Sequence, residues 1–129
     1  MKRLFCVLII VFVFCLGCSN SSSLKESDNE ILSIDVETVY SMLDDDIYIL
    51  DVREAYEYSS GHIKKSYNVP LSEIENIDKH WITSDSMIIV YCHSGNRSRK
   101  AAQKLVDMGY TNVYDMGGII DWNYELIVD

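Results

Sequence analysis

Residues 87–106 read MIIVYCHSGNRSRKAAQKLV, and this stretch decides the fold. Its first five residues are all apolar and do not alternate with polar ones, which is typical of a strand buried on both faces of a parallel sheet. Residues 98–110 follow a helical pattern, with apolar side chains on one stripe and charged ones elsewhere. The polar segment CHSGNR, residues 92–97, connects the two. A strand, a tight connection and a helix predict one unit of an α/β sheet.

The rest of the chain alternates in the same way. Strands are also predicted over residues 30–34, 47–52, 66–70 and 112–116. Helices are predicted after Asp35, which suits a helix N-cap, before Gly61, after Pro70, and over residues 117–127 at the end of the chain. Because strands alternate with helices, we predict an α/β fold with a mainly parallel central sheet flanked by helices.

The first twenty residues, MKRLFCVLIIVFVFCLGCSN, have the pattern of an export signal. Lys2 and Arg3 precede an uninterrupted apolar run of 13 residues from Leu4 to Leu16. A helix of that length spans ~20 Å at ~1.5 Å per residue, which is short of the ~30 Å hydrocarbon core of a membrane. We therefore expect residues 1–17 to be a signal peptide, and the alternative is an uncleaved N-terminal anchor.

The apolar run ends in CLGCSN, residues 15–20, which resembles the lipobox of bacterial lipoproteins. Gly17 and Cys18 match that motif, whereas Leu16 stands one position later than the usual leucine. The resemblance implies lipidation of Cys18 and attachment of an exported, periplasmic protein to a membrane of the cell envelope. Residues 18–30 are polar and serine-rich, which is typical of a flexible tether. The folded domain is expected over residues 31–129.

Charge and cysteine content narrow the function further. The net charge is −9, and loss of Lys2 and Arg3 with the signal peptide makes it −11, since nine Lys and Arg then stand against 20 Asp and Glu. This charge argues against a nucleic-acid partner. Of the four cysteines, only Cys92 lies in the domain, so a structural disulfide and a Cys-based metal cluster are excluded for the mature monomer. We expect the protein to act as a monomer.

The position of Cys92 suits a reactive thiol. In parallel sheets, sites form beyond the carboxyl ends of the strands, and Cys92 is expected at such an end. The following helix N-terminus presents unpaired amides that favour an anion. Gly95 allows a tight turn, and Arg97 adds a positive charge. This environment would favour the thiolate of Cys92.

Three motifs resemble those of the rhodanese family, a set of sulfurtransferase domains. CHSGNRS at 92–98 resembles the C-x-x-G-x-R-S loop of that family, DVREAYEYSSGHIKKSYNVP at 51–70 resembles a second signature, and DMGGIIDW at 115–122 resembles the closing x-x-G-G-x-x-x-W. The resemblance covers nearly all of residues 31–126. It implies a rhodanese-like, three-layer α/β domain over residues 31–129.

The resemblance also implies a mechanism. The Cys92 thiolate would attack the outer sulfur of a donor such as thiosulfate or a persulfide, and then pass that sulfur to a thiol or to cyanide. Backbone amides would hold the transferred sulfur, which makes the expected substrate-binding residues His93, Ser94, Gly95, Asn96, Arg97 and Ser98. No metal and no organic cofactor is required.

Other residues of the motifs are expected to have structural roles. Asp51 and Arg53 are interpreted as an ion pair that holds loops together, and the alternative is that they orient the Cys92 loop. His62 is expected to form structural hydrogen bonds. His93 is not expected to act as a base, because adjacent side chains on a curled loop point apart. Gly117, Gly118 and Trp122 suggest close backbone approach and core packing.

Alternative functions remain open at this stage. Phosphatases and arsenate reductases of a related fold use a C-x5-R loop, whereas Cys92 and Arg97 form the shorter C-x4-R, which leaves room for one sulfur atom. A second alternative is a non-catalytic binding or redox-sensing module. A third is a sulfur carrier that forms the persulfide but serves one protein partner.

Overall fold

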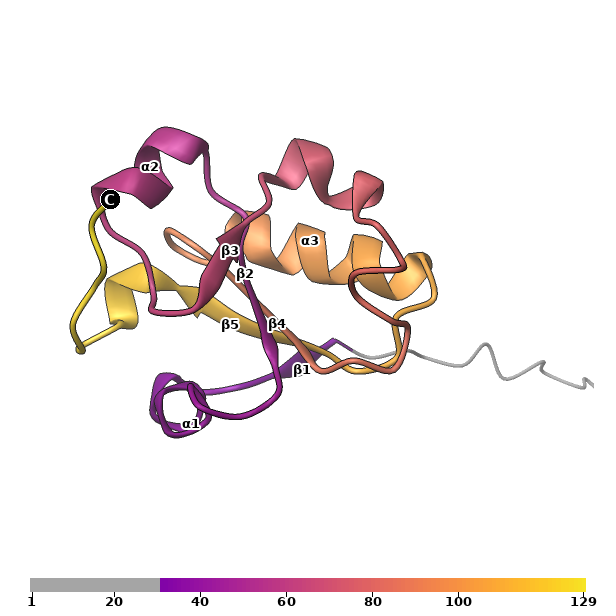
Figure 1. Ribbon diagram of the computed structural model, residues 1–129, viewed down its shortest axis with the longest axis horizontal. Coiled ribbons are helices and arrows are strands. Elements are labelled where there is room, and N and C mark those ends of the chain that lie inside the picture. Colours follow the sequence, from indigo (N-terminus) through magenta and orange to yellow (C-terminus); the bar gives the residue numbers. More distant parts are fainter. Residues whose placement is uncertain (1–30) are drawn as a thin grey trace, which may run out of the picture.

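The computed structural model describes residues 31–129 (Figure 1). The expected signal peptide at 1–17, the lipidation site Cys18 and the tether at 18–30 lie outside the described residues. Among residues 31–129, none of the helices has the length and apolar character needed to cross a membrane.

Strands and helices alternate along the described chain. The strands are β1 (Leu32–Ser33), β2 (Tyr48–Asp51), β3 (Ser66–Asn68), β4 (Ile88–Cys92) and β5 (Val113–Gly118). The α-helices are α1 (Val36–Ser41), α2 (Ala55–Ser60) and α3 (Asn96–Asp107). Two short 3-10 helices complete the set, η1 (Leu71–Asn76) and η2 (Ile119–Asp121).

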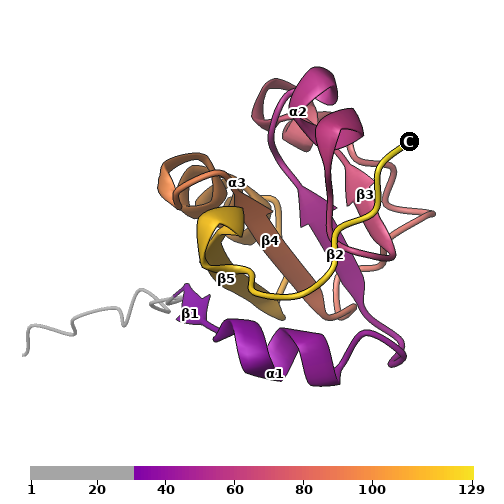
Figure 2. The same cartoon turned by 90° about the vertical axis from the view of Figure 1, so that its left-hand side faces the viewer.

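The five strands form one sheet with the order β1-β5-β4-β2-β3. Every pair of neighbouring strands is parallel. Figures 1 and 2 show three layers, with α1 on one face of the sheet and with α2, η1 and α3 on the other. The predicted α/β fold with a parallel sheet between helices is therefore confirmed.

The central strand β4 divides the core into two halves. All five of its residues are buried, as the unbroken apolar run predicted. Successive side chains of a strand point to opposite faces. Accordingly, Ile88, Val90 and Cys92 belong to the core beneath α3 and η1, and Ile89 and Tyr91 to the core against α1. The thiol of Cys92 therefore lies on the α3 side of the sheet.

Local signals explain where the helices begin and end. The side chain of Asp35 accepts a hydrogen bond from the amide of Thr38 at 2.8 Å and caps α1, as predicted. Gly61 follows α2 with a φ of 155°, a backbone conformation that favours glycine, and ends that helix as expected.

The prediction of a helix over residues 117–127 is wrong. Only Ile119–Asp121 forms a single 3-10 turn. The chain then runs back toward the segment that follows α2 and pairs with it through an isolated antiparallel bridge between Ile127 and His62. The two backbone hydrogen bonds of this bridge measure 2.8 and 2.9 Å. These long-range bonds hold the segment extended, although its local composition also suits a helix.

Candidate active site

Cys92 is the last residue of β4 and is 1% exposed. It lies at the carboxyl edge of the sheet, where α2, η2 and the start of α3 also gather at the left of Figure 1. The strand was predicted to end one residue earlier, at Tyr91. Its extension positions the Cys92 backbone rigidly, because Cys92 pairs with Gly118 of β5.

The connection to α3 is tighter than predicted. Only His93, Ser94 and Gly95 separate β4 from α3, and Asn96 and Arg97, which we expected in a free loop, belong to the first turn of the helix. Gly95 has a φ of 106°, so this turn requires the freedom of glycine. The turn brings the amide of Gly95 to within 3.0 Å of Cys92 Sγ, to which it donates a hydrogen bond.

Further backbone donors follow Gly95 at the start of α3. The amide of Arg99 donates to the carbonyl of Gly95 at 3.3 Å, which is the first hydrogen bond of the helix. The amides of Asn96, Arg97 and Ser98 precede it and have no acceptor within the helix. Such a helix start stabilises an anion through these amides and through the helix dipole. A thiolate or persulfide at Cys92 would have this environment.

The end of β5 contacts the loop that follows Cys92. The register shifts by one residue opposite Val90 and Tyr91, because β5 has an extra residue there, Met116, so that Tyr91 pairs with Gly117 and Cys92 with Gly118. Gly117 has a φ of 91°, which accommodates the bulge. The amide of Ile120 then donates to the carbonyl of His93 at 3.3 Å. The predicted close backbone approach is thus present at Gly118, whereas a Cβ atom at Gly117 would meet no other atom within 4 Å.

The guanidinium of Arg97 is bound by another side chain and is not free to turn toward the Cys92 loop. Its two terminal nitrogens donate to Glu57 of α2, at 2.7 Å to Oε2 and at 3.0 Å to Oε1. The hydrogen bonds from Arg97 lower the pKa of Glu57 to about 2. Hydrogen bonding to Glu57 in turn raises the pKa of Arg97, and the charges of Cys92 and Glu54 add to that effect. Arg97 is therefore held by Glu57 of α2, and negative charge at Cys92 would further favour its charged form.

Asp51 and Arg53 form a buried ion pair beside the site. The guanidinium donates to Asp51 Oδ2 at 2.6 Å and to the carbonyl of Gly61 at 2.7 Å. It also lies 5.8 Å from the ring centre of Tyr91, the residue before Cys92. Burial raises the pKa of Tyr91, so that its hydroxyl stays protonated. The pair connects the end of β2 with the residue after α2 and with Tyr91 of β4, which fits the interpretation that it holds loops together.

The two histidines near the motifs differ in environment. His62 is buried, stacks on the ring of Tyr58 at 3.7 Å and lies 3.0 Å from the Tyr58 carbonyl through Nδ1. These contacts fit the predicted structural role. His93 is exposed, whereas its neighbour Cys92 is buried, so the two side chains do point apart.

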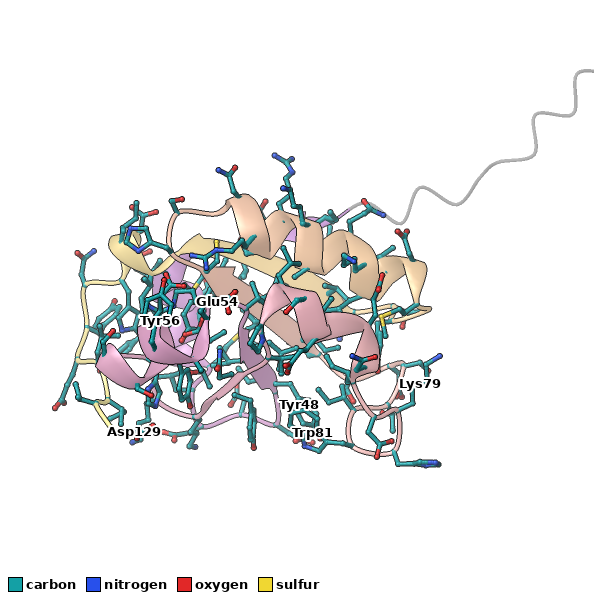
Figure 3. All side chains as sticks on the ribbon, turned by 90° about the horizontal axis from the view of Figure 1, so that it is seen from above. Tyr48, Glu54, Tyr56, Lys79, Trp81 and Asp129 are labelled. Atoms are coloured by element: carbon teal, nitrogen blue, oxygen red, sulfur yellow. The ribbon has the colours of Figure 1, made fainter. Side chains whose placement is uncertain are left out.

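Glu57 is the residue of the site that the sequence interpretation missed. It lies within the segment 51–70 that carried the second motif, but its partner Arg97 is 40 positions away. Figure 3 shows its neighbours Glu54 and Tyr56 toward the same end of the molecule as the start of α3, and Lys79 toward the other end. Between residues 31 and 129, no three His, Cys, Asp or Glu side chains gather in a way that could hold a metal ion.

Comparison with known proteins identifies the family. The family model described as rhodanese-like domain matches residues 35–125. The chain belongs to the rhodanese-like domain family. The predicted family resemblance of the domain is therefore confirmed.

Individual relatives include sulfurtransferases. Thiosulfate sulfurtransferase PspE of Escherichia coli is 36% identical over 73 residues, which are 56% of this chain and 70% of that protein. Adenylyltransferase and sulfurtransferase uba4 of Ogataea parapolymorpha is 35% identical over 80 residues, 61% of this chain and 21% of that protein. A crystal structure of a rhodanese-related protein from Thermoplasma volcanium is 32% identical with a TM-score of 0.66, and the match covers 76% of this chain and 99% of that one.

Several curated relatives are longer than the matched domain. The chain spans 21%, 62% and 53% of the length of three of them. What these relatives share with this chain is therefore the rhodanese-like domain.

Proposed function

We propose that this rhodanese-like domain is a sulfurtransferase that moves a sulfane sulfur from a donor such as thiosulfate to a thiophilic acceptor through a persulfide on Cys92. The observation that carries the proposal is the hydrogen bond from the Gly95 amide to Cys92 Sγ, 3.0 Å long, at the start of α3. It directs a backbone donor at the sulfur that would carry negative charge before and after transfer.

The first step loads the cysteine. The Cys92 thiolate attacks the outer sulfur of thiosulfate, a new S–S bond forms on Cys92, and the S–S bond of thiosulfate breaks. Sulfite leaves with the electron pair of the broken bond. Amides of His93 through Ser98 stabilise the new persulfide anion, as an oxyanion hole would.

The second step returns the enzyme to its starting state. An acceptor such as a thiolate or cyanide attacks the outer sulfur of the persulfide and forms a bond to it. The S–S bond on Cys92 breaks, and Cys92 leaves as a thiolate. No net oxidation or reduction of the protein occurs over the cycle.

The size of the site favours sulfur over phosphate. From Cys92 to Arg97 the chain has six residues, and the last two of these already belong to α3. Cys92 is 1% exposed, so space at the thiol suits a single added atom better than a tetrahedral phosphoryl group.

A steady-state assay tests the proposal. Wild-type protein with thiosulfate and cyanide should form thiocyanate and sulfite, and should not hydrolyse an aryl phosphate. Cys92→Ser should abolish thiocyanate formation and keep the fold, because the two side chains are close in size. A folded wild-type protein that forms no thiocyanate and transfers no sulfur to glutathione would leave the non-catalytic binding or redox-sensing module as the better account.

We also propose that the protein is exported and anchored to a membrane of the cell envelope by a lipid on Cys18. The support is in the sequence, from the basic and apolar start at residues 2–16 to Gly17 and Cys18. The tether at 18–30 would then join the lipid to β1.

A further inference from the structure

We propose that Glu57 determines donor specificity, because it engages Arg97 in the place that an anionic donor would take and thereby disfavours dianionic thiosulfate relative to sulfane-sulfur donors with a single negative charge. This inference rests on the proposed sulfurtransferase function. It assigns a role to a residue of α2 that neither transfers nor contacts the reacting sulfur.

The geometry of the pair supports this role. Both terminal nitrogens of Arg97 donate to Glu57, one to each carboxylate oxygen, at 2.7 and 3.0 Å. This two-bond arrangement is also the one in which a guanidinium binds a sulfonate or phosphate. A bound thiosulfate and Glu57 would therefore compete for the same two donors.

Glu57 is itself held in place. Its Oε2 also accepts a hydrogen bond from the amide of Glu54 at 3.0 Å, across the first turn of α2. The side chains of Glu57 and Arg97 are 19% and 31% exposed, so water screens the pair less than it screens an open surface pair. The low pKa of Glu57, about 2, keeps the carboxylate charged throughout the neutral range. Glu57 thus stays available to Arg97 whether or not a donor is present.

The electrostatic consequence depends on the charge of the donor. The thiolate form of Cys92 that attacks the donor would add a negative charge near Arg97, and Glu54 adds another. A dianion that approaches this site finds the charge of Arg97 already balanced by Glu57. A donor with one negative charge loses less binding free energy to the charge of Glu57, because the repulsion scales with the charge of the donor.

Two donors of matched shape isolate this effect. Thiosulfate carries two negative charges, whereas the methanethiosulfonate anion has a methyl group in place of one oxygen and carries one. Both give their outer sulfur to a thiolate, and the leaving groups are sulfite and methanesulfinate. For each donor, kcat and KM should be measured with cyanide as the acceptor, in wild type and in Glu57→Gln.

Glu57→Gln should raise kcat/KM for thiosulfate relative to methanethiosulfonate by about tenfold, the order expected for one unit charge in a partly exposed site. The change should lie mainly in the KM for thiosulfate, because the competition affects binding. Glu75→Gln is the matched control, since it removes the carboxylate of a different ion pair, between Glu75 of η1 and Lys104 of α3 at 2.9 Å, and should leave the ratio unchanged.

A purely structural role of Glu57 would lower kcat/KM for both donors equally, and an unchanged ratio would overturn the inference. If Glu57→Gln does not fold, Arg97→Ala serves instead. It leaves the charge of Glu57 unopposed, so the ratio should fall, and a ratio that stays constant or rises overturns the inference as well. If the wild-type protein takes sulfur from neither donor, the proposed sulfurtransferase function itself is wrong. If both donors are active but the ratio of their kcat/KM values is unchanged in Glu57→Gln, only the inference about Glu57 is wrong.

Discussion

Gly118 lies against the backbone of His93 so closely that a Cβ atom at Gly118 would stand 2.5 Å from the His93 carbonyl oxygen and 2.8 Å from the Cα of Ser94. The end of β5 therefore sets the position of the loop that follows Cys92. This contact is between backbone atoms, so neither side has a flexible side chain that could move away.

Gly118→Ala should displace the Cys92 loop. We expect a loss of stability of about 1–3 kcal/mol from overpacking and a fall of at least about tenfold in sulfur transfer to cyanide, because the amides would move relative to the sulfur. Urea unfolding and thiocyanate formation measure the two effects. Gly109→Ala is the control, because a Cβ atom at Gly109 would meet no other atom within 4 Å, and its φ of 98°, unlike the −105° of Gly118, makes it a test of backbone strain without overpacking. Equal transfer rates in both variants would contradict this account of the loop.

Breaking the buried ion pair at Asp51 should destabilise the domain strongly. Arg53→Met removes the partner of Asp51, which is 0% exposed, and leaves an uncompensated buried carboxylate. We expect a loss of about 3–5 kcal/mol in the free energy of unfolding, measured by urea denaturation.

The double variant Asp51→Asn with Arg53→Met should recover part of that loss, because no charge is then left unpaired. Lys104→Met breaks an exposed pair and should cost less than about 1 kcal/mol. A cost for Arg53→Met as small as that of Lys104→Met would contradict the interpretation of the buried pair as a structural element.

The pair between Glu57 and Arg97 should give a defined pH dependence of stability. The pKa of Glu57 falls from its ordinary value of 4.5 to about 2 in the folded protein because Arg97 donates hydrogen bonds to it. The unfolded chain therefore takes up a proton near pH 4.5 that the folded protein binds only near pH 2. The stabilisation is complete above the higher value and is lost as the pH falls through the lower one.

Urea unfolding of wild type and Glu57→Gln at a series of pH values tests this expectation. The difference between their unfolding free energies should be constant above about pH 5.5, should narrow below about 4.5 and should close toward pH 2. A difference that grows as the pH falls would be of the wrong sign for a depressed carboxylate pKa.

Cys18→Ala should alter the location of the protein. If Cys18 carries a lipid after cleavage, wild type should partition into the detergent phase, whereas the variant should retain its leader or appear in the aqueous phase. Detergent-phase separation and immunoblotting of the two proteins measure this. Equal detergent partitioning of both, with the leader attached in each, would support the uncleaved anchor instead.

Local sequence patterns predicted much of the fold, because the start and end of a helix and the burial of a strand depend mainly on neighbouring residues. The unbroken apolar run at Ile88–Cys92 identified the central strand, and Asp35 and Gly61 marked a helix start and a helix end. The terminal segment was predicted wrongly, because its extended conformation depends on hydrogen bonds between Ile127 and His62, 65 positions apart in the sequence.

The candidate site was predictable to a similar extent. The position of Cys92 at a strand end followed from its neighbours, and the tight turn followed from Gly95. The pairing of Arg97 with Glu57 did not follow, because several carboxylates were available to an arginine and only the tertiary structure places α2 beside the start of α3.

The central claim is that Cys92 takes up a sulfur atom, and the intact mass of the domain after treatment with thiosulfate tests it most directly. Wild type should gain roughly 32 Da, the mass of one sulfur, on the peptide that contains Cys92, and should lose it again on addition of cyanide. The adduct should protect Cys92 from iodoacetamide, and Cys92→Ser should acquire no added mass. A folded wild-type protein that gains no sulfur from thiosulfate or from a small-molecule persulfide would contradict the claim.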